Sequence, residues 1–220
     1  MDKKIILFDL DGTLTDSGPG IMNCVRYSLE RTGHEAVSQE VLRSFIGPPL
    51  VKQFMDAIGM TKEEAVHAVS VFRERYAVTG IFENSLYPGI KELLQKLSEK
   101  DHILGIASAK PMHFVDRVAE YFDIKKYFSI VKGSLSDNEN PNKLDVLGRA
   151  ISEAGYEDKK DLVYLVGDRK YDAAGARLSG IGFYGAAWGY AAKNELEEAG
   201  AKKIASDPLE LFGLIMDDDN

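Results

Sequence analysis

Short apolar runs alternate with amphipathic stretches along most of the chain. The run at residues 5–8 is fully apolar and ends in an Asp-Gly turn, which is typical of a strand buried on both faces of a parallel sheet. Similar runs lie at residues 103–107, 162–166 and 181–186, with weaker ones at 128–131 and 203–205. Stripes of apolar residues at helical spacing separate these runs. The alternation predicts an α/β fold with a doubly wound parallel sheet.

One interval, from Asp16 to about Asn84, breaks the alternation because it shows only helical periodicity. Apolar residues recur at helical spacing near residues 21–29 and 65–76, and shorter helices are expected at 41–45 and 51–58. An interval of nearly 70 residues is too long for an ordinary connection between two strands. We therefore predict a small α-helical cap domain at residues 16–84, inserted into a core domain formed by residues 1–15 and 85–220.

The composition limits the classes of function. The chain has 220 residues, of which 45% are hydrophobic, and a formal net charge of −8. This negative charge argues against a protein that binds the phosphate backbone of nucleic acids. Cys24 is the only cysteine, so no intrachain disulfide is possible, and it is expected to be a core residue. We expect no disulfide-linked partner and no membrane span, and we expect a cytoplasmic location.

The first candidate motif, Asp-Leu-Asp-Gly-Thr at residues 9–13, follows the first apolar run directly. A carboxylate at such a place is costly to bury unless it is paired or bound to a metal. Because Asp9 and Asp11 are two residues apart, both can face one site from an extended chain. Gly12 lets the backbone turn sharply just beyond them.

A second acidic motif ends another predicted strand. Asp168 follows the run at 162–166, and Asp172 lies four residues later, on the same face if a helix begins near Arg169. Carboxylates crowded together would repel one another and raise one another's pKa values. A hard divalent cation removes this repulsion, and ligation by oxygen alone favours Mg²⁺.

Two further residues fit the same site. Ser108 follows the run at 103–107, so its hydroxyl is expected at the carboxyl end of another strand, where it could bind a phosphate oxygen or stabilise a turn. Lys143 precedes the predicted helix at 144–154 and could reach a phosphate as a point charge.

Together these residues resemble the haloacid dehalogenase superfamily of phosphatases, and the resemblance covers essentially the whole chain. It implies a Rossmann-like core with an aspartate nucleophile at Asp9 and an acid/base at Asp11. It also implies a phosphate-binding Ser108 and an electrostatic role for Lys143. Within the superfamily, the order of motifs, the helical insert and the segments at 45–50 and 187–190 are similar to the phosphoglycolate phosphatase branch.

The resemblance further implies a metal site and substrate contacts. In this superfamily Mg²⁺ is held by the side chains at Asp9 and Asp168 and by the carbonyl of Asp11, with Asp172 in support. Contacts to the substrate are expected from Gly12, Thr13, Ser108, Ala109 and Lys143.

The predicted function is hydrolysis of a small phosphorylated metabolite, similar to phosphoglycolate, through an aspartyl-phosphate. The alternatives are a nucleotide or pyrophosphate phosphatase, a phosphosugar mutase of the same superfamily, a phosphonate-cleaving relative and a catalytically silent binding protein. Arg43 and Lys52 flank the Gly-Pro-Pro break at residues 47–49 and are candidates for contact with the leaving group of the substrate, or are merely exposed charges.

Overall fold

The computed structural model describes residues 3–100, 102–135 and 142–218. Within them the chain forms two compact units. Unit 1 comprises the described residues up to Thr15, residues 86–135 and residues 142–218, and unit 2 comprises Asp16–Ser85. Residues 136–141, which fall within the predicted core range, lie outside the described residues.

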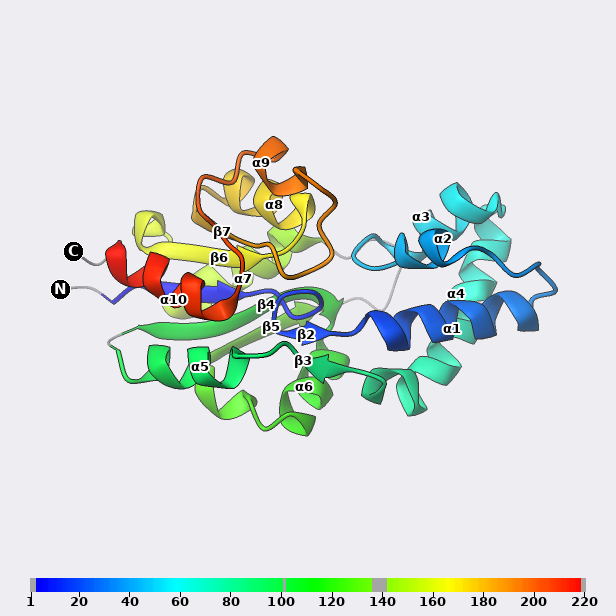
Figure 1. Cartoon of the computed structure of the whole chain (residues 1–220), viewed down its shortest axis with the longest axis horizontal. Helices are drawn as coiled ribbons and strands as arrows, with labels where there is room; N and C mark the ends of the chain where they lie inside the picture. The colour runs from blue at the N-terminus through cyan, green and yellow to red at the C-terminus, as the bar shows by residue number, and fades with distance from the viewer. Residues whose placement is uncertain (1–2, 101, 136–141, 219–220) are drawn as a thin grey trace. The chain divides into compact units, whose positions relative to one another are not determined.

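Unit 1 is built around a parallel sheet of six strands (Figure 1). The strands are β1 (Ile5–Phe8), β4 (Ile103–Pro111), β5 (Ile130–Ser134), β6 (Val163–Gly167), β7 (Gly182–Ala186) and β8 (Ile204–Ala205). Their order across the sheet is β5-β4-β1-β6-β7-β8, and every recorded pairing is parallel. The structure therefore confirms the predicted doubly wound α/β fold. It also extends β4 to Pro111 and moves the start of β5 to Ile130.

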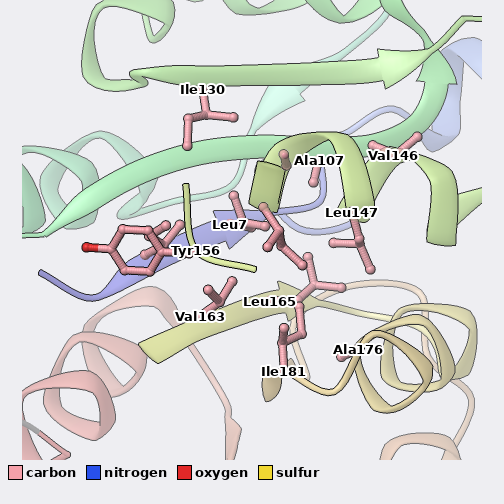
Figure 2. Close-up of a cluster of buried hydrophobic side chains, with 13 residues drawn as sticks. Leu7, Ala107, Ile130, Val146, Leu147, Tyr156, Val163, Leu165, Ala176 and Ile181 are labelled. Carbon is pink, nitrogen blue, oxygen red and sulfur yellow. The ribbon is translucent and has the colours of Figure 1, made fainter. Parts of the chain in front are cut away.

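Helices cover both faces of this sheet. They are α5 (Ile90–Ser98), α6 (Met112–Tyr121), α7 (Lys143–Ala154), α8 (Lys170–Ser179), α9 (Glu195–Glu198) and α10 (Pro208–Asp217), with single 3-10 turns at η3 (Lys125–Tyr127) and η4 (Lys160–Leu162). Right-handed crossovers place α5 and α6 on one face of the sheet and α7 and α8 on the other. Figure 2 shows the second of these layers, where Leu7 and Leu165 from the sheet pack with Leu147 of α7 and Ala176 of α8.

The register of the central strands determines where the site forms. Phe8 at the end of β1 lies opposite Ile106 of β4 and Val166 of β6. The residues that follow these three therefore emerge at the same carboxyl edge of the sheet. The strand order reverses at β1, so this edge is also the topological switch point, where ligands bind in folds of this type.

Unit 2 is helical. It contains α1 (Gly18–Arg31), α2 (Gln39–Arg43), α3 (Leu50–Gln53), the π-helical turn η1 (Phe54–Ile58), α4 (Lys62–Val78) and the 3-10 turn η2 (Gly80–Phe82). The predicted helix at 51–58 is therefore a short α-helix that continues as a π turn, and a π turn leaves no signature in apolar spacing at this length. α1 packs closely on the end of the unit, because a Cβ atom on Gly20 would lie 2.1 Å from the carbonyl oxygen of Gly80.

Two short strands, β2 (Thr15–Asp16) and β3 (Ser85–Leu86), pair with each other at the two places where the chain passes between the units. Cys24 of α1 is fully buried, as predicted for a core residue. None of the helices in the described ranges has the length and apolar character that crossing a membrane requires.

Candidate active site

Three carboxylates converge at the carboxyl edge of the sheet in unit 1. Asp9 follows β1, Asp168 follows β6 and Asp172 lies in the first turn of α8. One oxygen from each can be chosen so that all three lie within 4.8 Å of one another. Segments more than 150 residues apart in sequence thus supply one acidic cluster, because β1 and β6 are neighbours in the sheet.

Lys143, the first residue of α7, bridges two of these carboxylates. Its Nζ donates to Asp9 Oδ1 at 2.8 Å and lies 2.8 Å from Asp172 Oδ1. Its side chain is only 12% exposed, so the ammonium group is held inside the site. Gly175 on α8 makes room for this side chain, since a Cβ atom there would lie 3.0 Å from Lys143 Cγ.

Burial dominates the electrostatics of this cluster. It raises the pKa of Asp9 from 3.8 to about 6, although Lys143 opposes the shift. Burial also raises the pKa of Asp168, and the charge of Asp172 adds to the effect. The pKa of Lys143 lies above its usual range, since the two carboxylates that it bridges outweigh the effect of its burial. The carboxylates of the cluster therefore carry more negative charge than their buried surroundings favour.

Asp11 faces a different cation. Lys110, near the end of β4, donates from Nζ to both carboxylate oxygens of Asp11, at 2.9 and 2.8 Å. Ser108 lies on the same strand and is buried, and its hydroxyl accepts a long hydrogen bond from the Lys110 backbone N–H at 3.4 Å. The side chains predicted to act on the phosphate and on the leaving group thus come from adjoining strand ends.

The backbone after Asp11 is fixed against Asp168. Gly12 has a φ of +85°, and a Cβ atom there would lie 2.2 Å from Asp168 Oδ2, so only glycine fits. The hydroxyl of Thr13 donates to Asp168 Oδ1 at 3.3 Å. Both residues therefore hold Asp168 in its place in the acidic cluster. Their contacts with substrate remain a prediction.

A loop after β7, residues 187–195, closes over the same turn. The indole N–H of Trp188 donates to the Thr13 carbonyl at 3.0 Å, and the backbone N–H of Tyr190 donates to Asp168 Oδ2 at 2.8 Å. Gly189 between them has no room for a side chain, because a Cβ atom would lie 2.3 Å from Asp168 Cβ. This loop therefore binds the carboxylate oxygen of Asp168 that Thr13 does not bind.

The end of this loop is anchored by Glu195. Its Oε1 accepts from Arg169 Nε at 2.8 Å and from the Lys170 backbone N–H at 3.0 Å, and its Oε2 accepts from the Ala192 backbone N–H at 3.2 Å. These bonds tie the loop to the start of α8. Asp172 completes the connection, since its Oδ2 accepts from the backbone N–H of Arg169 at 3.1 Å.

Most of the predicted site residues thus lie at one edge of unit 1, including Ala109 on β4 beside Ser108. Arg43 and Lys52 belong to unit 2, where both are exposed and Lys52 pairs with Asp56. Their contact with substrate remains a prediction. Lys110 also lies at this edge, although no role for it was predicted. The alternation that brings Asp9 and Asp11 to one face also brings Ser108 and Lys110 to one face.

Comparison with known proteins gives the family. The model of the haloacid dehalogenase-like hydrolase family matches residues 6–186. The chain is 37% identical to a 5'-nucleotidase of Pseudomonas aeruginosa over 87% of this chain and 86% of that protein. It is 27% identical to a phosphoglycolate phosphatase of Vibrio parahaemolyticus over 97% of this chain and 96% of that protein.

Another relative carries a different name. The chain is 32% identical to the tyrosine-protein kinase PtkA of Mycobacterium tuberculosis, over 85% of this chain but only 63% of that protein. Among solved structures, a predicted phosphatase from Clostridium acetobutylicum superposes with a TM-score of 0.91 at 34% identity, covering 99% of this chain and 100% of that one. The chain therefore belongs to the haloacid dehalogenase-like hydrolase family and is a phosphatase of the branch that includes phosphoglycolate phosphatase.

Proposed function

We propose that this phosphatase hydrolyses a small phosphomonoester through a phosphorylated Asp9. The observation that carries the proposal is the position of Asp9, whose carboxylate lies at the switch point of the sheet and is bonded to the buried Lys143. A carboxylate held beside an ammonium group, with two further carboxylates close by, is suited to accept a phosphoryl group whose charge must be neutralised.

The acidic cluster fits Mg²⁺. Its donors are all oxygens, and with Asp11 the site has four carboxylates against the two amines of Lys110 and Lys143. Asp168 has further acceptor capacity, because each of its oxygens accepts one bond from the protein and a carboxylate has about four lone-pair sites. We propose Asp9, Asp168 and the Asp11 carbonyl as the ligands, supported by Asp172. Bound there, Mg²⁺ would neutralise charge on the phosphoryl group.

The proposed reaction has two steps. In the first, a carboxylate oxygen of Asp9 attacks phosphorus and the ester P–O bond breaks. The leaving oxygen keeps the bonding pair and accepts a proton from Asp11, which acts in its carboxylic acid form. In the second, Asp11 takes a proton from water while the water oxygen attacks phosphorus, and the bond to Asp9 breaks. Lys143 holds Asp9 in place and, together with Ser108, is expected to bind the phosphoryl oxygens.

Two variants test this mechanism. Asp9→Asn should abolish Mg²⁺-dependent hydrolysis of p-nitrophenyl phosphate, and acid-quenched wild-type enzyme should carry phosphate on the peptide that contains Asp9. Asp11→Asn should lose more activity on an alkyl phosphate than on p-nitrophenyl phosphate, since nitrophenolate leaves without a proton. Turnover at the wild-type rate in Asp9→Asn would falsify the covalent mechanism, and equal losses on both esters would contradict the acid role of Asp11.

Two classes of substrate are the main candidates for this enzyme. Phosphoglycolate is favoured by the relative that the chain matches along nearly its full length, and a nucleoside 5'-monophosphate by the relative with higher identity. Kinetic constants measured for both, and for pyrophosphate and a hexose phosphate, with and without Mg²⁺, separate them. A mutase would instead need a phosphorylated activator and transfer phosphate to sugar faster than to water, and a silent binding protein would turn over none of them.

We also propose that unit 2, which corresponds to the cap domain predicted at residues 16–84, excludes water during the reaction. Its helical composition and its insertion directly after the first acidic motif support this role. Arg43 is the proposed contact between this cap and the leaving group.

A further inference from the structure

Lys110 is buried and paired with a carboxylate, although nothing in its position in the sequence distinguishes it from a surface lysine. Its side chain is only 6% exposed, and an ammonium group buried to that extent is stable only when it is paired. Its Nζ binds both oxygens of Asp11, at 2.9 and 2.8 Å, instead of reaching solvent. Asp11 is itself only 18% exposed, so the pair is largely sheltered from screening by salt.

The backbone of β4 is shaped to bring Lys110 to this place. The pairing of β4 with β5 is regular up to Ala107 and then shifts register before Pro111. An irregularity of this kind re-aims the side chains that follow it, and such irregularities are frequent beside active sites. Gly133 on β5 allows the close approach, because a Cβ atom there would lie 2.8 Å from the Lys110 carbonyl oxygen and 2.6 Å from Met112 Cα.

We propose that Lys110 is the positioning residue for Asp11. This inference rests on the proposed function, in which Asp11 gives and takes the proton. The ammonium group binds both oxygens of the Asp11 carboxylate and so fixes the rotamer of this side chain. Among the described contacts, the carboxylate of Asp11 has no partner besides Lys110. Lys110 forms and breaks no bond in the reaction. Its effect is to present Asp11 to the leaving-group oxygen and later to water.

The test is a double-mutant cycle of Lys110→Met and Asp11→Asn, read as kcat/KM for an alkyl phosphate and for p-nitrophenyl phosphate. This quantity reports the step in which the leaving group departs. Lys110→Met should lower kcat/KM for the alkyl ester by about 10–100-fold, because a displaced acid loses most of its contribution. It should lower the value for the nitrophenyl ester far less. In the Asp11→Asn background, Lys110→Met should have almost no further effect.

Two other variants separate positioning from a merely structural role. Lys110→Arg keeps the cation and should restore part of the activity on the alkyl ester. Lys125→Met is the matched control, since Lys125 also contacts two carboxylates, Asp116 and Glu120, but on the exposed surface of α6 and η3. Lys125→Met should leave kcat/KM unchanged for both the alkyl phosphate and p-nitrophenyl phosphate.

Several results would overturn the proposal. Equal losses on both esters would make Lys110 a phosphate ligand or a structural residue, and so would a Lys110→Met effect of the same size in the Asp11→Asn background. Failure of the proposed function is recognised separately, because it appears as turnover that survives Asp9→Asn. In an enzyme that depends on Asp9, independent effects of the two substitutions reject the role of Lys110 alone.

Discussion

Asp9 is buried more deeply than its charge favours. Its pKa is raised to about 6 by burial, against the opposing effect of Lys143. The folded protein without metal therefore binds a proton at Asp9 more readily than the unfolded chain does. A group of this kind reduces the free energy of unfolding above its folded pKa and not below its unfolded pKa.

The first prediction concerns Asp9→Asn in the presence of a chelator. At pH 7.5 the variant should be more stable than the wild type by about 1–3 kcal/mol, because raising the pKa of a carboxyl from 3.8 to about 6 destabilises its charged form by roughly that free energy. The difference should shrink as the pH falls below about 6 and should vanish below 3.8, where Asp9 is protonated in both states. Urea unfolding of both proteins over this pH range measures it.

The metal provides the control for this comparison. Adding Mg²⁺ at pH 7.5 should stabilise the wild type more than Asp9→Asn, since the charged carboxylate then binds the ion. A wild type that is more stable than Asp9→Asn in chelator at pH 7.5 would contradict the burial argument.

At the scale of elements, the loop from Ala187 to Glu195 is as important to the site as the strands. Trp188 and Tyr190 bond to the turn after β1 and to Asp168, and Glu195 ties the loop to α8. The loop thus connects β1, β6 and α8, which carry the three acidic residues. Short elements with few apolar contacts can hold a site in this way when their polar groups are paired.

The second prediction tests this loop with Gly189→Ala. The added methyl group would overlap the Asp168 side chain and the Gly12 carbonyl, both 2.3 Å away, so the loop must move. We expect a loss of stability of about 1–3 kcal/mol and weaker Mg²⁺ binding. Gly148→Ala on α7 is the control, because nothing lies within 4 Å of its added atom and alanine favours a helix by about 0.5–1 kcal/mol. Calorimetric titration and urea unfolding measure both variants, and equal Mg²⁺ affinities would refute the bracing role.

At the scale of the whole molecule, the acidic edge lies entirely in unit 1, so a bound ion is linked to the folding of that unit. The third prediction is that Mg²⁺ raises its free energy of unfolding in proportion to the logarithm of concentration, by about 2.7 kcal/mol at one hundred times Kd. Asp168→Asn should lose most of this gain. Thermal unfolding followed by circular dichroism over a series of Mg²⁺ concentrations measures it, and an unchanged midpoint would count against the site.

The fourth prediction concerns unit 2. Arg43→Ala should change the ratio of kcat/KM between phosphoglycolate and a nucleoside monophosphate while the stabilisation by Mg²⁺ stays as in the wild type, because Arg43 belongs to unit 2 and the acidic cluster to unit 1. Arg31→Ala, an exposed arginine at the end of α1 in the same unit, is the control and should leave the ratio alone. If the two variants behave alike, Arg43 is merely an exposed charge.

The sequence predicted the features that depend on local pattern. Apolar runs predicted the strands, and the acidic residues directly after two of them predicted where carboxylates would meet once β1 and β6 were neighbours. The partners of these residues were less predictable. Lys110 resembles any surface lysine until the irregular end of β4 turns it toward Asp11, and the role of Glu195 depends on the path of a loop with no periodic pattern.

The hydrogen bond from Trp188 to Thr13 has a practical consequence. Trp188 is the only tryptophan in the chain, so indole fluorescence arises from one side chain, directly beside the turn that carries Asp11. Emission from this fluorophore is sensitive to the polarity around the ring. Rearrangement of the turn when an ion or a phosphate analogue such as vanadate arrives should therefore change the emission spectrum of the unlabelled protein, and stopped-flow mixing could follow that event in real time.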